Sequence, residues 1–288
     1  MIAHVAEASE GRGRVVVRLG DFACSSASAI AATIHVAQAF RSQIEGLFVE
    51  NPDLHAACSL GVVREVALHG RKSQKLAASR LSQDAEHFAV AAQRQLADAA
   101  SRSGVAFTAR VIRDTAVGAL QTACNQSGPW NIIVFAEPIA SPEKSTLLCD
   151  VMAHVFGTTG TIASGRFSSW RKGPILVAVE DIERLNGMIR AAQQLAAVEG
   201  DDVLLMPIGP DEFALDWLES EIRLTLGEAH GVSVLARASH VGFADVLRAD
   251  IAARKPRLVI ARHGGILLPV DDQARPLAEL GCPVFQVH

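Results

Sequence analysis

Two short polar segments carry the residue types best suited to binding an anion. Arg262-His-Gly-Gly265 follows one apolar run, and Glu180-Asp181 follows another. Glycines let the backbone approach a phosphate group closely, and main-chain N–H groups beside a cationic side chain bind anions. Adjacent glycines are also typical of a tight turn with positive φ, and the turn is the interpretation that we favour.

Motifs for other kinds of chemistry are absent from the sequence. It contains no Walker Gly-Lys-Ser/Thr, no Gly-x-Ser-x-Gly elbow, no His-Glu-x-x-His and no Cys-x-x-Cys. Gly11-Arg-Gly13 precedes the first apolar run instead of following it, so a dinucleotide fingerprint is excluded. We therefore predict no catalytic residue and no metal site, and we interpret the ten histidines as structural or surface residues and the five cysteines as reduced thiols.

Composition indicates a globular protein with a well-filled interior. Of 288 residues, 49% are hydrophobic and 20% are charged, and the formal net charge is −4. A dedicated nucleic-acid binder normally has a basic excess, so this class is disfavoured. No apolar run approaches the roughly 20 residues that span a bilayer, and residues 1–13 lack the apolar stretch of a secretory signal. We expect a disordered tail over 1–13, a cytoplasmic protein and no membrane partner.

Short runs rich in Val, Ile and Leu alternate with longer amphipathic stretches. This alternation, with short links, predicts parallel sheets flanked by helices. The predicted strands are Val15–Leu19, Gln43–Val49, Ala106–Ile112, Asn131–Ala136, Thr159–Ala163, Ile175–Val179, Asp202–Ile208, Val232–Ala236, Leu258–Ala261 and Val284–Val287. The predicted helices are Ser26–Arg41, Ser79–Ser103, Ala116–Gln126, Thr146–Phe156, Leu185–Glu199, Glu212–Ala229 and Phe243–Arg254.

The two halves of the chain are similar to each other. A shift of 127 residues, without a gap, gives seven identities in the 32 positions from Gly104 to Phe135, among them Leu120 with Leu247 and Ile133 with Ile260. Unrelated segments would match at roughly two positions, so a duplication is favoured over two coincidentally similar units. The turn-rich segment 165–173 predicts the boundary between domains at 14–165 and 173–288.

The connection 51–78 is long for its position in the first half. Within it, Val62–Val66 has the pattern of a short additional element. The segment is interpreted either as a flap over the carboxyl ends of the strands, where open α/β sheets hold ligands, or as a plain connecting loop.

Several of these segments resemble the universal stress protein family. Ile175-Leu-Val-Ala-Val-Glu180 and Gly281-Cys-Pro-Val-Phe-Gln-Val287 resemble the first and last strands of such a domain. In the first half, Ile44–Glu50 resembles the second strand, and Val111–Leu120 resembles the third strand with its following helix. The resemblance covers nearly the whole chain as two copies and implies two adenine nucleotide hydrolase-like domains. Each would be a mostly parallel five-stranded sheet with helices on both faces.

The resemblance also implies where a nucleotide would bind. ATP-binding members carry Gly-x2-Gly-x9-Gly-Ser/Thr after the fourth strand, and their glycine N–H groups donate to the phosphates. Here Ala136, Ile139 and Cys149 stand at the glycine positions, and Asp150 stands at the Ser/Thr position. Cβ atoms and a carboxylate at these places disfavour a triphosphate, unless a bridging Mg²⁺ makes Asp150 a ligand.

The remaining positions of the implied pocket are only partly retained. Glu180 and Asp181 stand where the family places an aspartate facing the adenosine, and in the first half that carboxylate is shifted or missing. The implied pocket, mostly degenerate, comprises Gly20, Asp21, Val49, Ala136, Ile139, Cys149, Asp150, Glu180, Asp181, His263, Gly264 and Gly265.

These observations favour a regulatory stress protein that binds without turnover and has no cofactor. A pocket for another small ligand, lined by Val49, Phe135 and Ile139, ranks second, and ATP binding ranks third. The last strand of each half, Thr159–Ala163 and Val284–Val287, is predicted to be the edge where domains or chains meet. We also expect a homodimer and a regulatory protein partner.

Overall fold

The computed structural model of the protein describes residues 13–19, 27–50, 52, 56, 60, 64–66, 73–75, 78–126, 130–135, 158–163, 172–226, 232–234, 244–270 and 274–288. Strands and helices alternate along these residues, as the apolar runs predict. In the first half the elements are β1 (Arg14–Leu19), α1 (Ala27–Ala39), β2 (Gln43–Glu50), β3 (Arg64–Val66), β4 (Ser73–Lys75), α3 (Ala78–Arg102), β5 (Phe107–Arg113), α4 (Ala116–Asn125), β6 (Asn131–Phe135) and β7 (Thr158–Ala163). The predicted helix Thr146–Phe156 and the predicted boundary segment before 172 lie outside the described residues.

The second half repeats the order of the first. Its elements are β8 (Ile175–Val179), α6 (Leu185–Ala197), β9 (Val203–Pro207), α7 (Glu212–Leu226), β10 (Val232–Val234), α8 (Ala244–Ala253), β11 (Leu258–Arg262), α9 (Ala274–Leu280) and β12 (Val284–Val287). The α/β class and the mostly parallel five-stranded arrangement of each half are confirmed, because neighbouring strands within a half pair in parallel.

The two halves form one continuous sheet of ten strands in the order β10-β9-β8-β11-β12-β7-β6-β1-β2-β5. The halves join where β7 pairs with β12 in antiparallel fashion, from Gly160 opposite Val287 to Ala163 opposite Val284. The prediction that these two last strands meet is therefore confirmed. Each already has a neighbour on both sides within the chain, so neither edge is left for a second copy.

The predicted shift of 127 residues between the halves is wrong for the fourth strand. Ile132 of β6 pairs with Val15 and Leu258 of β11 pairs with Ile175, so the equivalent residues there are 126 apart (258 − 132). Ile133 and Ile260, matched by the gapless shift, pack on opposite faces of the sheet. The duplication is visible in the strand order, which is the same in both halves. The alignment of the two halves shifts by one residue between the helices α4 and α8 and the strands β6 and β11 that follow them.

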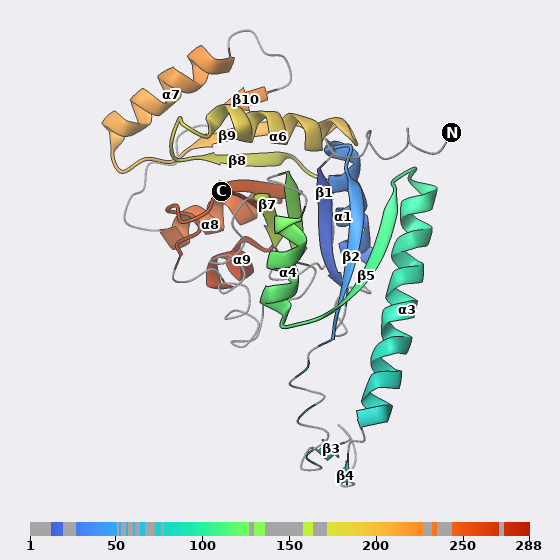
Figure 1. Cartoon of the computed structure of the whole chain (residues 1–288). Coiled ribbons are helices and arrows are strands. Elements are labelled where there is room, and N and C mark those ends of the chain that lie inside the picture. Colours follow the sequence, from blue (N-terminus) through green and yellow to red (C-terminus); the bar gives the residue numbers. More distant parts are fainter. Residues whose placement is uncertain are drawn as a thin grey trace.

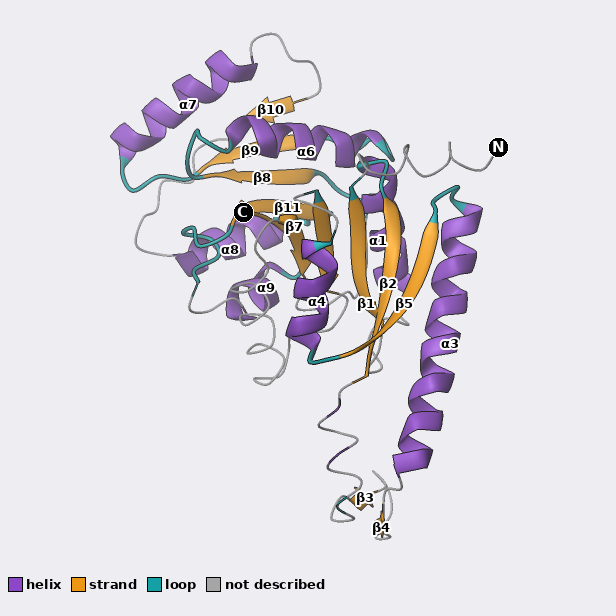
Figure 2. Cartoon of the chain, viewed as in Figure 1, coloured by secondary structure: helices purple, strands orange, loops and turns teal. Residues whose placement is uncertain are grey.

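Helices cover both faces of the ten-stranded sheet (Figures 1 and 2). One face is buried by α1, α3, α6 and α7, through residues such as Val36, Leu96 and Leu195. The other is buried by α4, α8 and α9, through residues such as Leu120 and Leu277. Burial of the strands on both faces explains why their sequences are nearly continuous apolar runs.

The long connection after β2 contains an antiparallel pair, β3 with β4, which forms a separate two-stranded sheet. This confirms the additional element that Val62–Val66 predicted. In Figure 1 the pair projects beyond the end of β2 and lies clear of the ten-stranded sheet, so the described part of this segment does not form the flap that was one of the two interpretations.

A cluster of polar side chains, most of them buried, joins β1, β2, β5 and β6. Arg14 is 9% exposed and Glu45 is 5% exposed, and Arg14 Nη1 donates to the Glu45 carboxylate. Arg110 Nη2 lies 3.1 Å from the same carboxylate, and Asn131 Nδ2 donates to the carbonyl of Cys124 at 2.8 Å. Each of these four side chains has a polar partner, as burial in an apolar setting requires.

Two of the five cysteines fall within the described residues, and both are free thiols. Cys124 and Cys282 are buried, and burial raises the pKa of each thiol to about 12. Among the described residues, no helix is long and apolar enough to cross a membrane. Over the same part of the chain, no group of three His, Cys, Asp or Glu side chains is placed to hold a metal ion.

Candidate functional site

In the second half, the structure brings five of the predicted site residues to one end of the sheet. Strands β8 and β11 are neighbours and parallel, so the residues that follow each strand emerge at the same edge. Glu180 and Asp181 follow β8, and the turn 263–265 follows β11. This is the carboxyl edge, where open parallel sheets hold their ligands.

The carboxylate of Glu180 occupies the main-chain donors of this edge. Its Oε2 accepts from the N–H of Ile266 at 2.6 Å, and its Oε1 accepts from the N–H of Leu267 at 3.1 Å. Gly265 allows the close approach, because a Cβ atom there would lie 2.2 Å from Oε2 of Glu180. Two successive N–H groups directed at one anion are the arrangement that binds phosphate in other proteins, and here the anion belongs to the chain itself.

Burial raises the pKa of the Glu180 carboxyl above its usual range, although the two N–H donors and Arg262 act in the opposite direction.

The Arg262 guanidinium, which is the cation of this site, also has a partner within the chain. Arg262 Nη1 lies 2.9 Å from Oδ2 of Asp181, and Asp181 Oδ1 accepts from the main-chain N–H of Arg184 at 3.2 Å. Both acidic residues at the end of β8 therefore bind groups of their own chain.

The segment after β11 forms the tight turn that the adjacent glycines predicted. Gly264 has φ +73°, a left-handed conformation that favours glycine. Its N–H donates to the carbonyl of Leu268 at 3.0 Å. His263 points elsewhere, with Nδ1 3.1 Å from Gln286 Oε1 and its ring 4.9 Å from that of His288. The turn interpretation is confirmed, and the side chain of His263 is engaged with the last strand.

In the first half, one residue of the implied pocket can be placed. Val49 lies on β2 and is half-buried, while Phe135, at the end of β6, is 7% exposed and packs in the core. These two strands are separated by β1, so the residues are not on neighbouring strands. The other predicted positions lie outside the described residues: Gly20, Asp21, Ala136, Ile139, Cys149 and Asp150.

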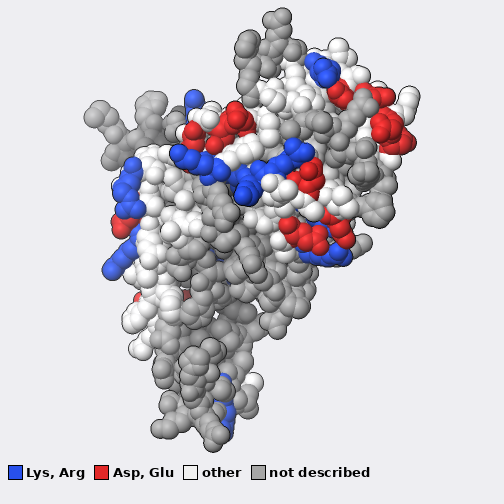
Figure 3. Space-filling model, turned by 180° about the vertical axis from the view of Figure 1, so that it is seen from behind, with Lys and Arg blue, Asp and Glu red and all other residues white. Residues whose placement is uncertain are grey.

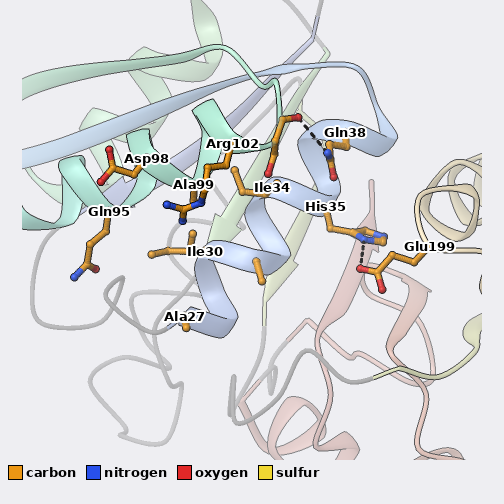
Figure 4. Close-up of a pocket in the computed structure, with 12 residues that line it drawn as sticks. Ala27, Ile30, Ile34, His35, Gln38, Gln95, Asp98, Ala99, Arg102 and Glu199 are labelled. Atoms are coloured by element: carbon orange, nitrogen blue, oxygen red, sulfur yellow. Dashed lines mark hydrogen bonds and ion pairs between the residues drawn. The ribbon is translucent and has the colours of Figure 1, made fainter.

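A groove that sequence reasoning missed runs between α1 and α3 (Figure 4). It has a volume of about 660 Å³. Its lining includes the small residues Ala31 of α1 and Ala99 of α3, and Asp98 and Arg102 stand one helical turn apart on α3. Its mixed lining suits a ligand with both polar and apolar parts. Both helices were predicted from the sequence, as Ser26–Arg41 and Ser79–Ser103, but the gap between them was not.

One wall of this groove is also a contact between the two halves of the chain. His35 of α1 is 3% exposed, and its Nε2 donates to the carbonyl of Leu195 in α6 at 2.8 Å. Its Nδ1 lies 3.4 Å from Oε1 of Glu199, as Figure 4 shows. Glu199 in turn accepts from the buried Arg257 at 2.8 Å, and Arg257 Nε lies 3.1 Å from Asp201. A histidine of the first half thus joins an ion-pair cluster of the second.

Burial lowers the pKa of the His35 imidazole, and the positive charge of Arg257 adds to this, against the Leu195 carbonyl and Glu199, which raise it. The native protein therefore binds the proton less readily than the unfolded chain. We expect stability to fall as the pH drops below about 6.5, with a slope of at most about 1.4 kcal/mol per pH unit from this group. His35→Gln should flatten that dependence.

Urea unfolding of both proteins at a series of pH values measures this effect. His87→Gln is the matched control, because His87 is exposed on α3. The same slope in wild type and His35→Gln would contradict the assignment of this pH dependence to His35.

Comparisons with known proteins agree with this architecture. No protein-family model matches the sequence, and no curated protein matches it. Among solved structures, a universal stress protein from Archaeoglobus fulgidus superimposes with a TM-score of 0.61 at 12% identity, covering 94% of this chain and 95% of that one. The cytoplasmic domain of a prokaryotic cation chloride cotransporter gives 0.57 at 10% identity, covering 96% and 95%. A functionally unknown protein from Pseudomonas aeruginosa gives 0.55 at 14% identity, covering 98% and 94%.

These likenesses extend over nearly the whole length of each chain, so they include both halves. At such low identity they show the fold and not the activity. The fold that the sequence resemblance implied is confirmed: the chain has the α/β fold of universal stress proteins, present twice in one polypeptide.

Proposed function

We propose that this protein is a non-catalytic, regulatory member of the universal stress protein type that does not bind ATP at the carboxyl edge of its strands. One observation carries the proposal: the Glu180 carboxylate accepts the N–H groups of both Ile266 and Leu267. The donors with which a phosphate group would pair already have an internal anion. The neighbouring cation, Arg262, is paired with Asp181.

Electrostatics supports the proposal. A phosphate oxygen about 4 Å from the Glu180 carboxylate would be repelled by on the order of 1–4 kcal/mol, at dielectrics between water and a protein surface. It would also have to displace two existing hydrogen bonds, worth about 0.5–1.5 kcal/mol each. Together these costs are roughly 2–7 kcal/mol, which is about 1.5 to five decades in affinity. In the first half, Cβ-bearing residues replace glycine at Ala136, Ile139 and Cys149, and these together with the acidic Asp150 argue in the same direction from the sequence.

Isothermal calorimetry with ATP and Mg²⁺ tests this function. The wild-type protein is expected to give no binding heat up to millimolar nucleotide. Glu180→Ala, which frees the two N–H donors, is expected to gain weak binding of ATP or inorganic phosphate. Glu183→Ala is the matched control, because Glu183 is exposed in the same loop. Micromolar binding of ATP by the wild type would refute the proposal, and a Glu180→Ala variant that gains nothing would show that the carboxylate is not the reason.

A second function, binding of another small ligand, is favoured by the groove of about 660 Å³ between α1 and α3. Its lining combines the charged Asp98, Arg102 and Glu199 with aliphatic Ile30 and Ile34. Native mass spectrometry of freshly purified protein should then show a co-purifying compound that is lost in an Ala99→Trp variant. Repeated spectra of the bare chain would count against this function.

The expected homodimer also belongs to the proposal. The tandem arrangement already provides the pairing of β7 with β12, so a dimer would have to use a different surface. Sedimentation at micromolar concentration distinguishes the two states, and a monomer mass would remove the dimer from the proposal.

A further inference from the structure

Helix α7 (Glu212–Leu226) has large apolar side chains on two opposite faces. The inner face packs on the sheet and is buried at Leu215, Leu218 and Ile222. These positions recur every three to four residues, as in any helix with one core-facing stripe. They account for the docking of α7 against β9 and the core.

The outer face carries a second apolar stripe, which the described part of the fold leaves exposed. Phe213 is 83% exposed, Trp217 is 53% exposed and Leu224 is 76% exposed. At about 100° per residue, these three side chains fall within about 40° of one another around the helix, on the side opposite to the core. We call them the α7 outer stripe. Large exposed apolar side chains in line, unlike singly scattered ones, mark an interaction surface.

Acidic side chains accompany the outer stripe. Over 211–226 there are five carboxylates and one cation, a net charge of −4 (1 − 5): Asp211, Glu212, Asp216, Glu219, Glu221 and Arg223. The one cation is turned toward Glu219 at 2.7 Å. Figure 3 shows acidic side chains gathered over the end of the molecule at which α7 lies in Figure 1. Two copies of this helix facing each other would bring like charges together, whereas a basic partner would be attracted.

We propose that the α7 outer stripe is a docking surface for a basic amphipathic helix of a partner protein. Phe213, Trp217 and Leu224 would pack against apolar residues of the partner spaced three and four apart. The flanking carboxylates would pair with its Lys or Arg side chains. Aromatic residues dominate the energy of such interfaces, so Phe213 and Trp217 would carry most of the affinity. The inference does not depend on the nucleotide site.

The test uses the full chain and a synthetic amphipathic helical peptide of about 18 residues, with leucines on one face and lysines on its flanks. A second peptide has every lysine replaced by glutamate. Calorimetry should show binding of the basic peptide, weakened by added salt, and no binding of the acidic one. Trp217→Ala should weaken binding about tenfold or more.

Trp130→Ala is the matched control, because Trp130 is 65% exposed at a distance in sequence from α7 and should leave binding unchanged. A melting temperature equal to that of wild type verifies that each variant folds. Three results would overturn the proposal: no binding of the basic peptide, equal binding of both peptides, or equal binding by wild type and Trp217→Ala. Sedimentation showing a dimer of the chain that Trp217→Ala dissociates would assign the stripe to self-association instead.

Discussion

Replacing Glu45 with alanine is expected to lower the free energy of unfolding by about 3–5 kcal/mol, the cost of leaving a buried charge without its partner. Glu45 is 5% exposed and accepts from Arg14, which is itself buried. Without the carboxylate, the acceptors left to Arg14 among the described residues would be neutral: the Asn131 side chain at 3.4 Å and a main-chain carbonyl of α4. Arg110, 3.1 Å from Glu45, would also lose its anion.

Urea denaturation of wild type and Glu45→Ala measures the loss. Glu50→Ala is the matched control on the same strand, because the pair of Glu50 with Arg113 is exposed and should contribute little. The free energy of unfolding of Glu45→Gln should lie between those of wild type and Glu45→Ala, because glutamine keeps a neutral acceptor for Arg14. A loss at Glu45 no larger than at Glu50 would mean that the cluster is not stabilising.

Phe285→Ala is expected to cost about 3–5 kcal/mol, as for a large aromatic side chain removed from a core. Phe285 of β12 is 1% exposed, and its ring stacks on that of Phe40, with centroids 5.9 Å apart. It also fills the space beside Gly160 of β7, where an added Cβ would lie 2.6 Å from the ring. Its loss should weaken the junction of the two halves before it weakens either half.

Hydrogen exchange distinguishes that local effect from a general one. In Phe285→Ala the amides of β7 and β12 should lose protection more than those of β1 and β8. Phe213→Ala, at a side chain 83% exposed, should leave the exchange pattern unchanged. Equal loss of protection across all strands would contradict a junction that opens separately.

Much of the fold follows from local sequence. Continuous apolar runs bounded by Gly, Pro or polar residues specify buried strands, and the bounds of Ile175–Val179 and Val284–Val287 are those predicted. The pairing of β7 with β12 follows from a general argument, that an apolar edge strand needs a neighbour. The one-residue shift in the alignment of β6 with β11 could not be predicted. Val, Ile and Leu occupy adjacent positions in both strands, so several alignments of the two halves match equally well.

The site was less predictable, for a physical reason. The sequence shows that Glu180 follows a strand and that glycines follow another, but its pairing with Ile266 and Leu267 joins residues 86 and 87 positions apart. A carboxylate near a turn can either face a bound ligand or occupy the N–H groups that a ligand would use. The distances between the carboxylate and these N–H groups decide between the two. The groove beside His35 likewise depends on how two helices pack, which the pattern of each helix alone does not specify.

The most direct measurement is of the two main-chain donors themselves. In nuclear magnetic resonance spectra of the ¹⁵N-labelled protein, the amide signals of Ile266 and Leu267 should stay in place when ATP and Mg²⁺ are added, because Glu180 already holds both N–H groups. The same signals should move in Glu180→Ala. Movement of these two amides in the wild-type protein, saturating with nucleotide, would contradict the account.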